Sequence, residues 1–146
     1  MTDLTVALDC EAIEVPMDAW SEPFWAAAAE HRLLVPRCGN CGLFRWPPGP
    51  FCPDCHSQQV AWQEPGEGRV YTFTLVPKPA REDGQPASIT APALIEFAAA
   101  PGLRLMSTIV GAPVDQIRIG APVQVDWLAA ANATVPIFRL REGERP

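Results

Sequence analysis

The alternation of apolar and polar side chains predicts that most of the chain after residue 68 forms β-strands. Within 69–78, Tyr71, Phe73 and Leu75 lie on one face of an extended strand, and smaller or polar residues lie on the other. Further runs of this kind follow, separated by turn sequences rich in glycine, proline and asparagine. The expected strands are 69–78, 93–98, 103–110, 121–129 and 134–140.

The connections between these strands narrow the fold class. Residues 77–92 are rich in proline, glycine and polar residues, which predicts a long, mobile loop. A short helical turn is expected at 115–119, and Pro136 predicts an edge position or a bulge in the last strand. Periodicity alone also allows a sandwich, but this order of strands favours a five-stranded Greek-key barrel of the OB type.

A helix is expected at 21–32, before the strands. Ser21 is a suitable N-cap, and the alanines that follow have high helix propensity. Phe24, Ala27, Ala28 and His31 are spaced to share one face. Such a helix fits two roles equally, covering the domain or anchoring a partner. Upstream of it, an extended arm and a partly ordered terminus both remain open for residues 1–20.

Two Cys-x-x-Cys pairs, Cys38/Cys41 and Cys52/Cys55, are separated by ten residues. Two such turns facing each other place four thiolates in a tetrahedron around Zn²⁺, at about 2.3 Å from the metal. Gly42 follows the first pair, where the backbone needs a positive φ, whereas the second pair is followed by His56. Four cysteines close the ligand shell, so the site is expected to be structural. Iron suits four thiolates as well, and zinc is the default.

Disulfide bonds and redox chemistry are weaker readings of these cysteines. The first residues show neither the basic nor the apolar region of a signal peptide, so a cytoplasmic, reducing setting is expected. A redox Cys-x-x-Cys precedes a helix, but the segment RWPPGP at 45–50 cannot be helical. Cys10 lies far from the pairs in sequence and is expected to be a free thiol, not a fifth ligand.

Composition and charge exclude some function classes. The formal net charge is −6 and there is a single lysine, which argues against phosphate-dependent nucleic-acid binding. Seven acidic residues and no Lys or Arg fall within 1–30. No apolar run is long enough to span a membrane. No nucleophile–base motif or phosphate-binding glycine loop is present, so catalysis by this chain alone is not expected.

The order of the helix, the cysteine pairs and the strand motifs resembles the DUF35 family of zinc-ribbon/OB-fold proteins. The resemblance covers roughly residues 20–140, and only His56 departs from the usual pattern of the knuckles. The motifs that carry it are Phe24-Trp25, Leu33-Leu34 with Arg37-Cys38, both cysteine pairs, Pro47-Pro48, Phe51-Cys52-Pro53, the residues Gly68, Val70, Tyr71, Phe73 and Thr74, and Ile119-Gly120 with Pro122-Val123.

The resemblance implies a mainly β protein in which an N-terminal helix precedes a rubredoxin-like zinc ribbon and a five-stranded OB-fold barrel. The expected parts are an arm and helix at 1–32, the ribbon at 33–66, the OB domain at 67–141 and a polar tail at 142–146. It also implies a non-catalytic subunit of a hetero-oligomer, docked to a thiolase-like enzyme that acts on acyl-CoA. That partner would be a thiolase, a lipid-transfer-protein-like aldolase or an acyltransferase, with a role in processes such as lipid or steroid degradation. The acyl group stays open among a steroid side chain, an aromatic acyl group and a short ketoacyl group.

Candidate contact residues follow from these roles. Aromatic side chains anchor interfaces, although several of them could instead form the ribbon's own core. The candidates for the partner are Phe24, Trp25, Phe44 and Trp46. The phosphates of CoA need cations, for which Arg37, Arg45 and Lys78 are the candidates, although nothing in the sequence shows that they converge. The competing hypothesis is an OB-fold module that binds single-stranded nucleic acid.

Overall fold

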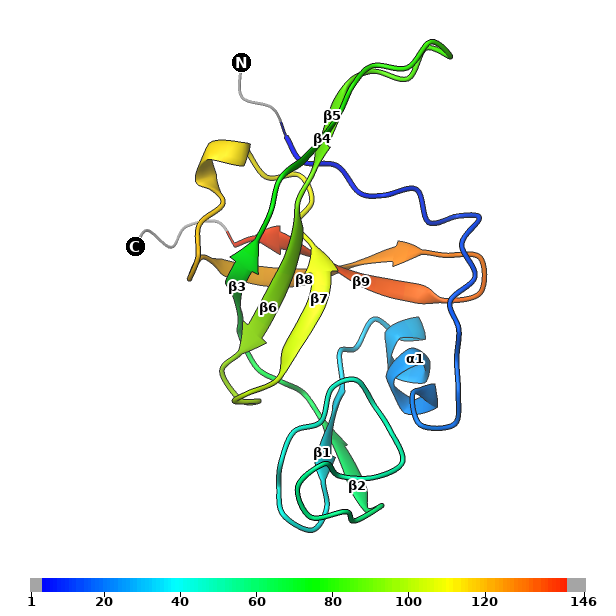
Figure 1. Ribbon diagram of the computed structural model, residues 1–146, viewed down its shortest axis with the longest axis vertical. Helices are drawn as coiled ribbons and strands as arrows, with labels where there is room; N and C mark the ends of the chain where they lie inside the picture. The colour runs from blue at the N-terminus through cyan, green and yellow to red at the C-terminus, as the bar shows by residue number, and fades with distance from the viewer. Residues whose placement is uncertain (1–3, 142–146) are drawn as a thin grey trace.

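The computed structural model describes residues 4–141, so the polar tail expected at 142–146 lies outside the described residues. Figure 1 shows a ribbon with one helix beside it, a curled sheet, and a long hairpin that extends away from that sheet. The elements are α1 (Glu22–Ala29), β1 (Val35–Cys38), β2 (Val60–Gln63), β3 (Gly68–Phe73), β4 (Val76–Lys78), β5 (Ser88–Thr90), β6 (Pro92–Phe97), β7 (Arg104–Thr108), the 3-10 helix η1 (Val114–Gln116), β8 (Pro122–Ala129) and β9 (Thr134–Leu140).

Helix α1 is shorter than expected at its C-terminal end. His31 adopts a left-handed conformation with φ of 58°, and the N–H groups of His31 and Arg32 donate to the carbonyls of Ala28 and Ala27. This arrangement satisfies carbonyls that the helix would otherwise leave free. Ser21 does not cap the helix with its side chain, contrary to expectation. Its N–H donates instead to Asp18 Oδ1 at 2.8 Å.

The ribbon is held by a two-stranded antiparallel sheet of β1 and β2. The segment directly after the first cysteine pair adds one isolated bridge to this sheet, between Arg37 and Phe44. Pro47 and Pro48 lack the N–H that a longer ladder would need, so the chain leaves the sheet there. The segment that follows the second pair, β2, is the main partner of β1.

Five strands form the second sheet in the order β7-β6-β3-β8-β9. The sheet curls because the two ends of this order meet through a parallel bridge between Ile109 and Phe138. The N–H of Val110 also donates to the Phe138 carbonyl at 2.8 Å. A five-stranded sheet closed in this way is an OB-type half-barrel, which confirms the expected fold class. Pro136 lies in β9, which stands at one end of the strand order, as its sequence position predicted.

The expected alternation in the first barrel strand is broken by a bulge. The pairing of β3 with β6 shifts register between Val70 and Thr72. Val70 is therefore fully buried and Phe73 half-buried, while Tyr71 and Thr72 both face solvent. The prediction that Tyr71 shares a buried face with Phe73 is wrong for this reason.

The segment expected as a long loop carries a hairpin. Strands β4 and β5 pair antiparallel, with Val76 opposite Thr90 and Lys78 opposite Ser88. Figure 1 shows the hairpin projecting from the barrel at the end opposite the ribbon. Its side chains between Val76 and Ala87 are exposed, so the pairing stands outside the core.

One hydrophobic core joins the helix, the ribbon and the barrel. Phe24 from α1 and Val35 from β1 belong to the same buried cluster as Ile95, Ile109 and Phe138 from the barrel. The position of the ribbon is therefore fixed by packing against the barrel as well as by its own sheet.

Among the described residues, no helix has the length and apolar character needed to cross a membrane.

Residues 4–20 form a mainly extended arm, and the first three residues of the expected segment lie outside the described residues. Near one end, Thr5 is buried and its Oγ1 accepts the N–H of Ala112 at 3.2 Å. Near the other, Val15 and the Asn132 side chain exchange two hydrogen bonds. Figure 1 shows the arm running along one side of the molecule down to α1.

Replacing Phe138 tests whether the barrel closure supports the whole fold. Phe138 is 1% exposed, so Phe138→Ala should lower the free energy of unfolding by about 3–5 kcal/mol. Met106→Ala is the control, because Met106 is 67% exposed and should change it by less than about 0.5 kcal/mol. Urea unfolding of both variants measures the difference, and equal stabilities would contradict the assigned core.

Candidate functional site

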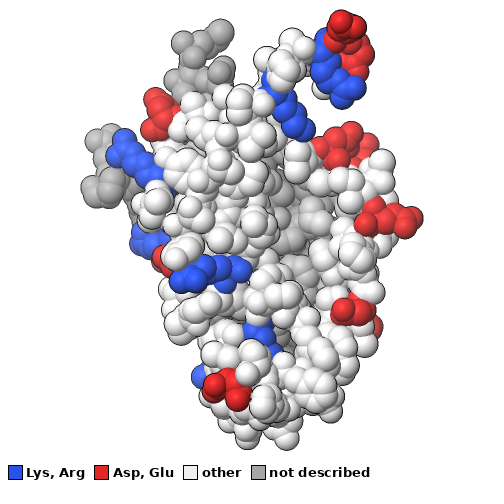
Figure 2. All heavy atoms as spheres, viewed as in Figure 1, with Lys and Arg blue, Asp and Glu red and all other residues white. Residues whose placement is uncertain are grey.

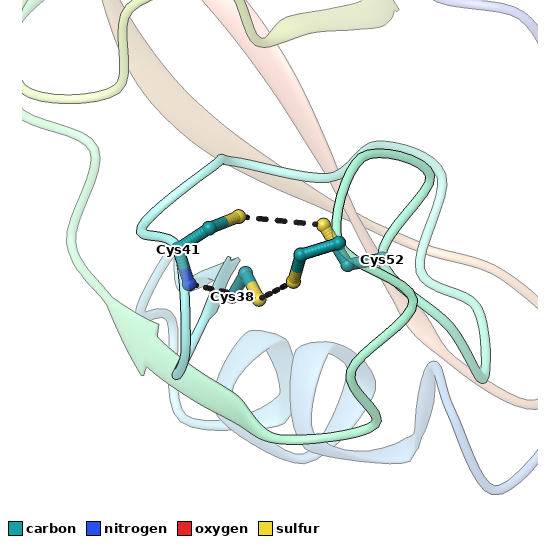
Figure 3. Close-up of side chains that lie close together, drawn as sticks. Cys38, Cys41 and Cys52 are labelled. Carbon is teal, nitrogen blue, oxygen red and sulfur yellow. Dashed lines mark hydrogen bonds between the residues drawn. The ribbon is translucent and has the colours of Figure 1, made fainter.

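The four paired cysteines converge on one point in the ribbon. Their sulfur atoms all lie within 4.8 Å of one another. Cys38 Sγ lies 3.5 Å from Cys55 Sγ, and Cys41 Sγ lies 3.6 Å from Cys52 Sγ. Figure 3 shows the labelled side chains of Cys38, Cys41 and Cys52 pointing toward a common centre. Each short separation joins one sulfur from the first pair to one from the second.

The two cysteine turns have matching backbone geometry. In the first turn, Gly42 N–H donates to the Cys38 carbonyl at 3.1 Å, and in the second His56 N–H donates to the Cys52 carbonyl at 3.0 Å. Gly42 has a φ of 80° and His56 a φ of 63°. The left-handed position expected after each pair is therefore present in both, and His56 occupies it although it is not glycine.

The pKa values of the Cys38 and Cys41 thiols depend on the groups around them. The N–H of Cys41 donates to Cys38 Sγ and lowers the pKa of that thiol to about 6, against the effect of burial. At Cys41 the Leu43 N–H lowers the pKa, but burial and the three neighbouring cysteine side chains outweigh it and raise the pKa to about 12. Because the raised pKa of Cys41 opposes ionisation of that thiol at neutral pH, a bound dication is what would allow four thiolates.

The geometry fits a metal and not a disulfide. A tetrahedron with metal–sulfur bonds of about 2.3 Å has edges of about 3.8 Å, close to the two short separations above. A disulfide would need about 2.05 Å, and all five cysteines are free thiols. Cys10 lies in the arm and takes no part in the cluster. The four-cysteine arrangement therefore supports structural zinc.

A hollow of about 420 Å³ lies beside the first cysteine turn, where the ribbon faces the turn between β6 and β7. The Arg37 guanidinium lies over the Phe44 ring at 5.4 Å, and its Nε donates to the Gly42 carbonyl at 3.0 Å. Cys41 and Asp54 also line the hollow, with Ala99 and Pro101 on the barrel side.

The three cations proposed for CoA do not come together. Arg37 lines the hollow, whereas Arg45 is 4% exposed and lies inside the ribbon. Lys78 lies on the hairpin strand β4, at the opposite end of the molecule in Figure 1. A phosphate site that uses all three side chains is therefore not formed.

The four aromatic residues proposed for a partner contact differ in accessibility. Phe24 is 3% exposed and packs edge-on against Trp25 and Trp46, with ring centroids 4.9 and 5.1 Å apart. It is a core residue and is not available to a partner. Trp25, Phe44 and Trp46 are half-buried against the same core, so part of each ring faces solvent.

The N-terminal arm carries exposed apolar side chains that were not among the predicted contact residues. Its exposed apolar residues include Leu8, Ile13, Met17 and Trp20, each between 41% and 50% exposed. Exposed acidic residues alternate with them along the arm: Asp9, Glu11, Glu14 and Asp18. Figure 2 shows the acidic groups spread along the edge where the arm runs. The acidic character of the arm could be read from the sequence, because residues 1–30 contain no Lys or Arg.

A four-cysteine ribbon that shares its core with an OB half-barrel defines the class of two-domain zinc-ribbon/OB-fold proteins. Residues 25–61 match the ChsH2 rubredoxin-like zinc ribbon domain, and residues 62–128 match the ChsH2 C-terminal OB-fold domain. A solved chain described as "Ltp2-ChsH2(DUF35) aldolase" is 36% identical, with a TM-score of 0.71 over 87% of this chain and 98% of that chain. The chain belongs to the ChsH2/DUF35 family, which confirms the resemblance seen in its motifs.

Two further similarities are of different kinds. A "Probable enoyl-CoA hydratase alpha subunit" of Thermomonospora curvata is 38% identical over 121 residues, or 80% of this chain. The chain spans only 36% of the length of that relative. A DUF35 protein of unknown function from Sulfolobus solfataricus has a TM-score of 0.59 over 86% of this chain and 87% of its own. At 17% identity it shows the shared fold alone.

The residues that follow the two cysteine pairs allow a paired test. Gly42→Ala should destabilise the protein by about 1–2 kcal/mol, because alanine resists a φ of 80° and its Cβ would lie 3.2 Å from the Arg37 side chain. His56→Gly should be neutral or stabilising by up to about 1 kcal/mol, because it relieves the same strain. Thermal unfolding of the metal-loaded variants measures both, and effects of the same sign would refute the assignment.

Proposed function

We propose that this protein is a non-catalytic, zinc-binding subunit that docks and supports a thiolase-like enzyme acting on acyl-CoA substrates. The observation that carries the proposal is the similarity over nearly the whole of a chain described as part of an Ltp2-ChsH2 aldolase. The relative described as an enoyl-CoA hydratase alpha subunit is also part of a larger enzyme. The partner's reaction would be the cleavage or formation of a carbon–carbon bond next to the thioester.

In this proposal Cys38, Cys41, Cys52 and Cys55 hold one zinc ion. The ion supplies cross-linking between the two cysteine turns, and its four protein ligands leave no position for a catalytic water. The turns bury few apolar side chains of their own, so the ion replaces part of a missing core. Iron remains the second candidate for the same four sulfurs.

The histidines support an accessory role. His31 stacks on Trp127 with ring centroids 5.5 Å apart, and its backbone ends helix α1. His56 holds the left-handed position behind the second cysteine pair. Both histidines thus have positions in which their backbone conformation ends a helix or a turn. We assign the nucleophile and base of the reaction to the partner.

The docking surface that we propose consists of the arm and the exposed parts of Trp25 and Trp46. Trp20 and Met17 lie next to α1 in sequence and are 41% and 45% exposed. Large aromatic and flexible apolar side chains of this kind commonly anchor interfaces. The alternating acidic residues of the arm favour a partner surface that combines apolar pockets with basic side chains.

Of the three candidate cations, we propose Arg37 as the one that contacts a CoA phosphate, because it lines the hollow beside the ribbon. Its stacking on Phe44 and its bond to Gly42 hold the guanidinium in place. The alternative role as a nucleic-acid module has less support. Such a module stacks bases on exposed aromatic rings, but the exposed ring of Tyr71 on the barrel has the Arg104 guanidinium over it, 3.9 Å from the ring centroid.

Metal analysis tests the zinc assignment. The purified protein should contain one zinc ion per chain, and Cys52→Ser should lose most of it and unfold at a lower temperature. Plasma mass spectrometry gives the metal content, and Cys10→Ser is the control because Cys10 lies outside the cluster. Iron in place of zinc would revise the metal, and unchanged metal content in Cys52→Ser would reject the site.

Native mass spectrometry tests the docking. Co-expression with a thiolase-like enzyme encoded in the same operon should give a heteromeric mass, and Trp20→Ala should weaken the complex about tenfold or more. Met106→Ala is the control, because Met106 is an apolar residue on the barrel strand β7 that is even more exposed than Trp20, at 67% against 41%. Phe24→Ala is unsuitable, because removing a core residue would destabilise the fold itself. A metal-loaded chain that remains separate from such enzymes would reject the proposed function.

A further inference from the structure

Arg45 is a buried arginine in the ribbon. Its side chain is 4% exposed, although a guanidinium remains charged throughout the physiological pH range. Transferring a charged group out of water carries a large cost unless an opposite charge or several hydrogen bonds offset it. The surroundings of Arg45 should therefore contain a compensating negative charge.

No carboxylate provides that charge among residues 4–141. The salt bridges found there use other arginines: Arg32, Arg81, Arg139 and Arg141. The Arg45 side chain donates to the Gln59 carbonyl, and its buried Nε has no hydrogen-bond partner. A single neutral carbonyl does not balance a full positive charge, so the described chain leaves Arg45 uncompensated.

Arg45 is hydrogen-bonded to the same part of the ribbon as the first cysteine turn. The Gln59 carbonyl that accepts from Arg45 also accepts the N–H of Gly39 at 2.9 Å, and Gly39 directly follows Cys38. The Arg45 backbone is held against β1, the strand that ends at Cys38, because its N–H donates to the Pro36 carbonyl at 3.1 Å. One shared acceptor thus connects the guanidinium to the backbone of the first cysteine turn.

The charge of a metal–thiolate centre matches this requirement. A divalent ion with four thiolates carries a formal charge of −2. We propose that the Arg45 guanidinium is the counter-charge of this centre, so that the buried arginine and the metal stabilise each other. The inference rests on the proposed zinc site, and it identifies a residue outside the ligand set that sets metal affinity.

Metal affinity of Arg45 variants tests the inference. Arg45→Met keeps most of the side-chain volume and removes the charge, so the affinity for Co²⁺ and Zn²⁺ should fall by about 10–100-fold. Arg45→Lys keeps the charge and should recover most of the affinity. Arg32→Met is the matched control, because Arg32 is exposed near the start of the ribbon and should change affinity less than about threefold. Competition with a chelator, followed by Co²⁺ absorbance, gives the values.

The outcomes separate this inference from the proposed function. A wild-type protein that binds no metal would reject the zinc site itself. A wild-type protein that binds metal, with Arg45→Met of equal affinity, would reject only the role of Arg45. If Arg45 served packing alone, methionine should be neutral or stabilising, because buried charges are often replaced by apolar groups without loss.

A second measurement needs no variant and covers the case in which Arg45→Met fails to fold. In the Co²⁺-substituted wild-type protein, the paramagnetic ion shifts the nuclear magnetic resonance signals of nearby groups. The Arg45 Nε–H signal should move strongly relative to the Zn²⁺ form, whereas that of Arg118, on the barrel, should move little. An Arg45 Nε–H signal at the same position in both forms would overturn the inference.

Discussion

The convergence of four sulfurs on one point is the constraint on which the ribbon depends. Between Cys38 and Val60 few side chains are buried, and the only regular structure is the end of β1. Two turns of matching backbone geometry present the sulfurs, and repulsion among four thiolates opposes that arrangement. A bound cation offsets this repulsion, because it attracts all four thiolates to a common centre. The loops that carry the cysteines are held in place by that attraction.

The ribbon is not an independent folding unit, because its core is continuous with that of the helix and the barrel. Phe24 of the helix contacts Trp25 and Trp46, and all three belong to the core that continues into the barrel. Metal binding in the ribbon and the presentation of the aromatic rings beside α1 are therefore linked by direct packing. A subunit built in this way can hold a recognition surface rigid although the ribbon itself is small.

The cysteine site and the barrel strands can be predicted from the sequence because they depend on local spacing. The two cysteine pairs specify their site through short turns, and the barrel strands follow the period of their apolar residues, as in 121–129 and 134–140. Features that depend on cross-strand partners were missed. The bulge at Tyr71 arises from register with β6, and the β4–β5 hairpin is hidden by Pro77 and Pro79, which weaken any strand signal.

Burial of individual side chains was equally inaccessible from the sequence. Phe24 and Trp25 are neighbours on one short helix, yet only the first is fully buried, because consecutive helical residues point about 100° apart and the barrel covers one face. Arg45 reads as a surface cation, since long charged side chains usually reach solvent. The groups that it bonds to, the carbonyls of Gln59 and Pro36, are distant in sequence, and no local pattern encodes that arrangement.

The attachment of the arm at both ends has a mechanical consequence. Thr5 is bonded to Gly111 and Ala112, immediately after the bridge that closes the barrel at Ile109, and Val15 is bonded to the turn between β8 and β9. The arm therefore acts as a strap across the seam where the first and last strands of the sheet meet. Because the arm joins the segment after β7 to the turn between β8 and β9, separating these two parts of the barrel also requires the arm to lose its hydrogen bonds at one end.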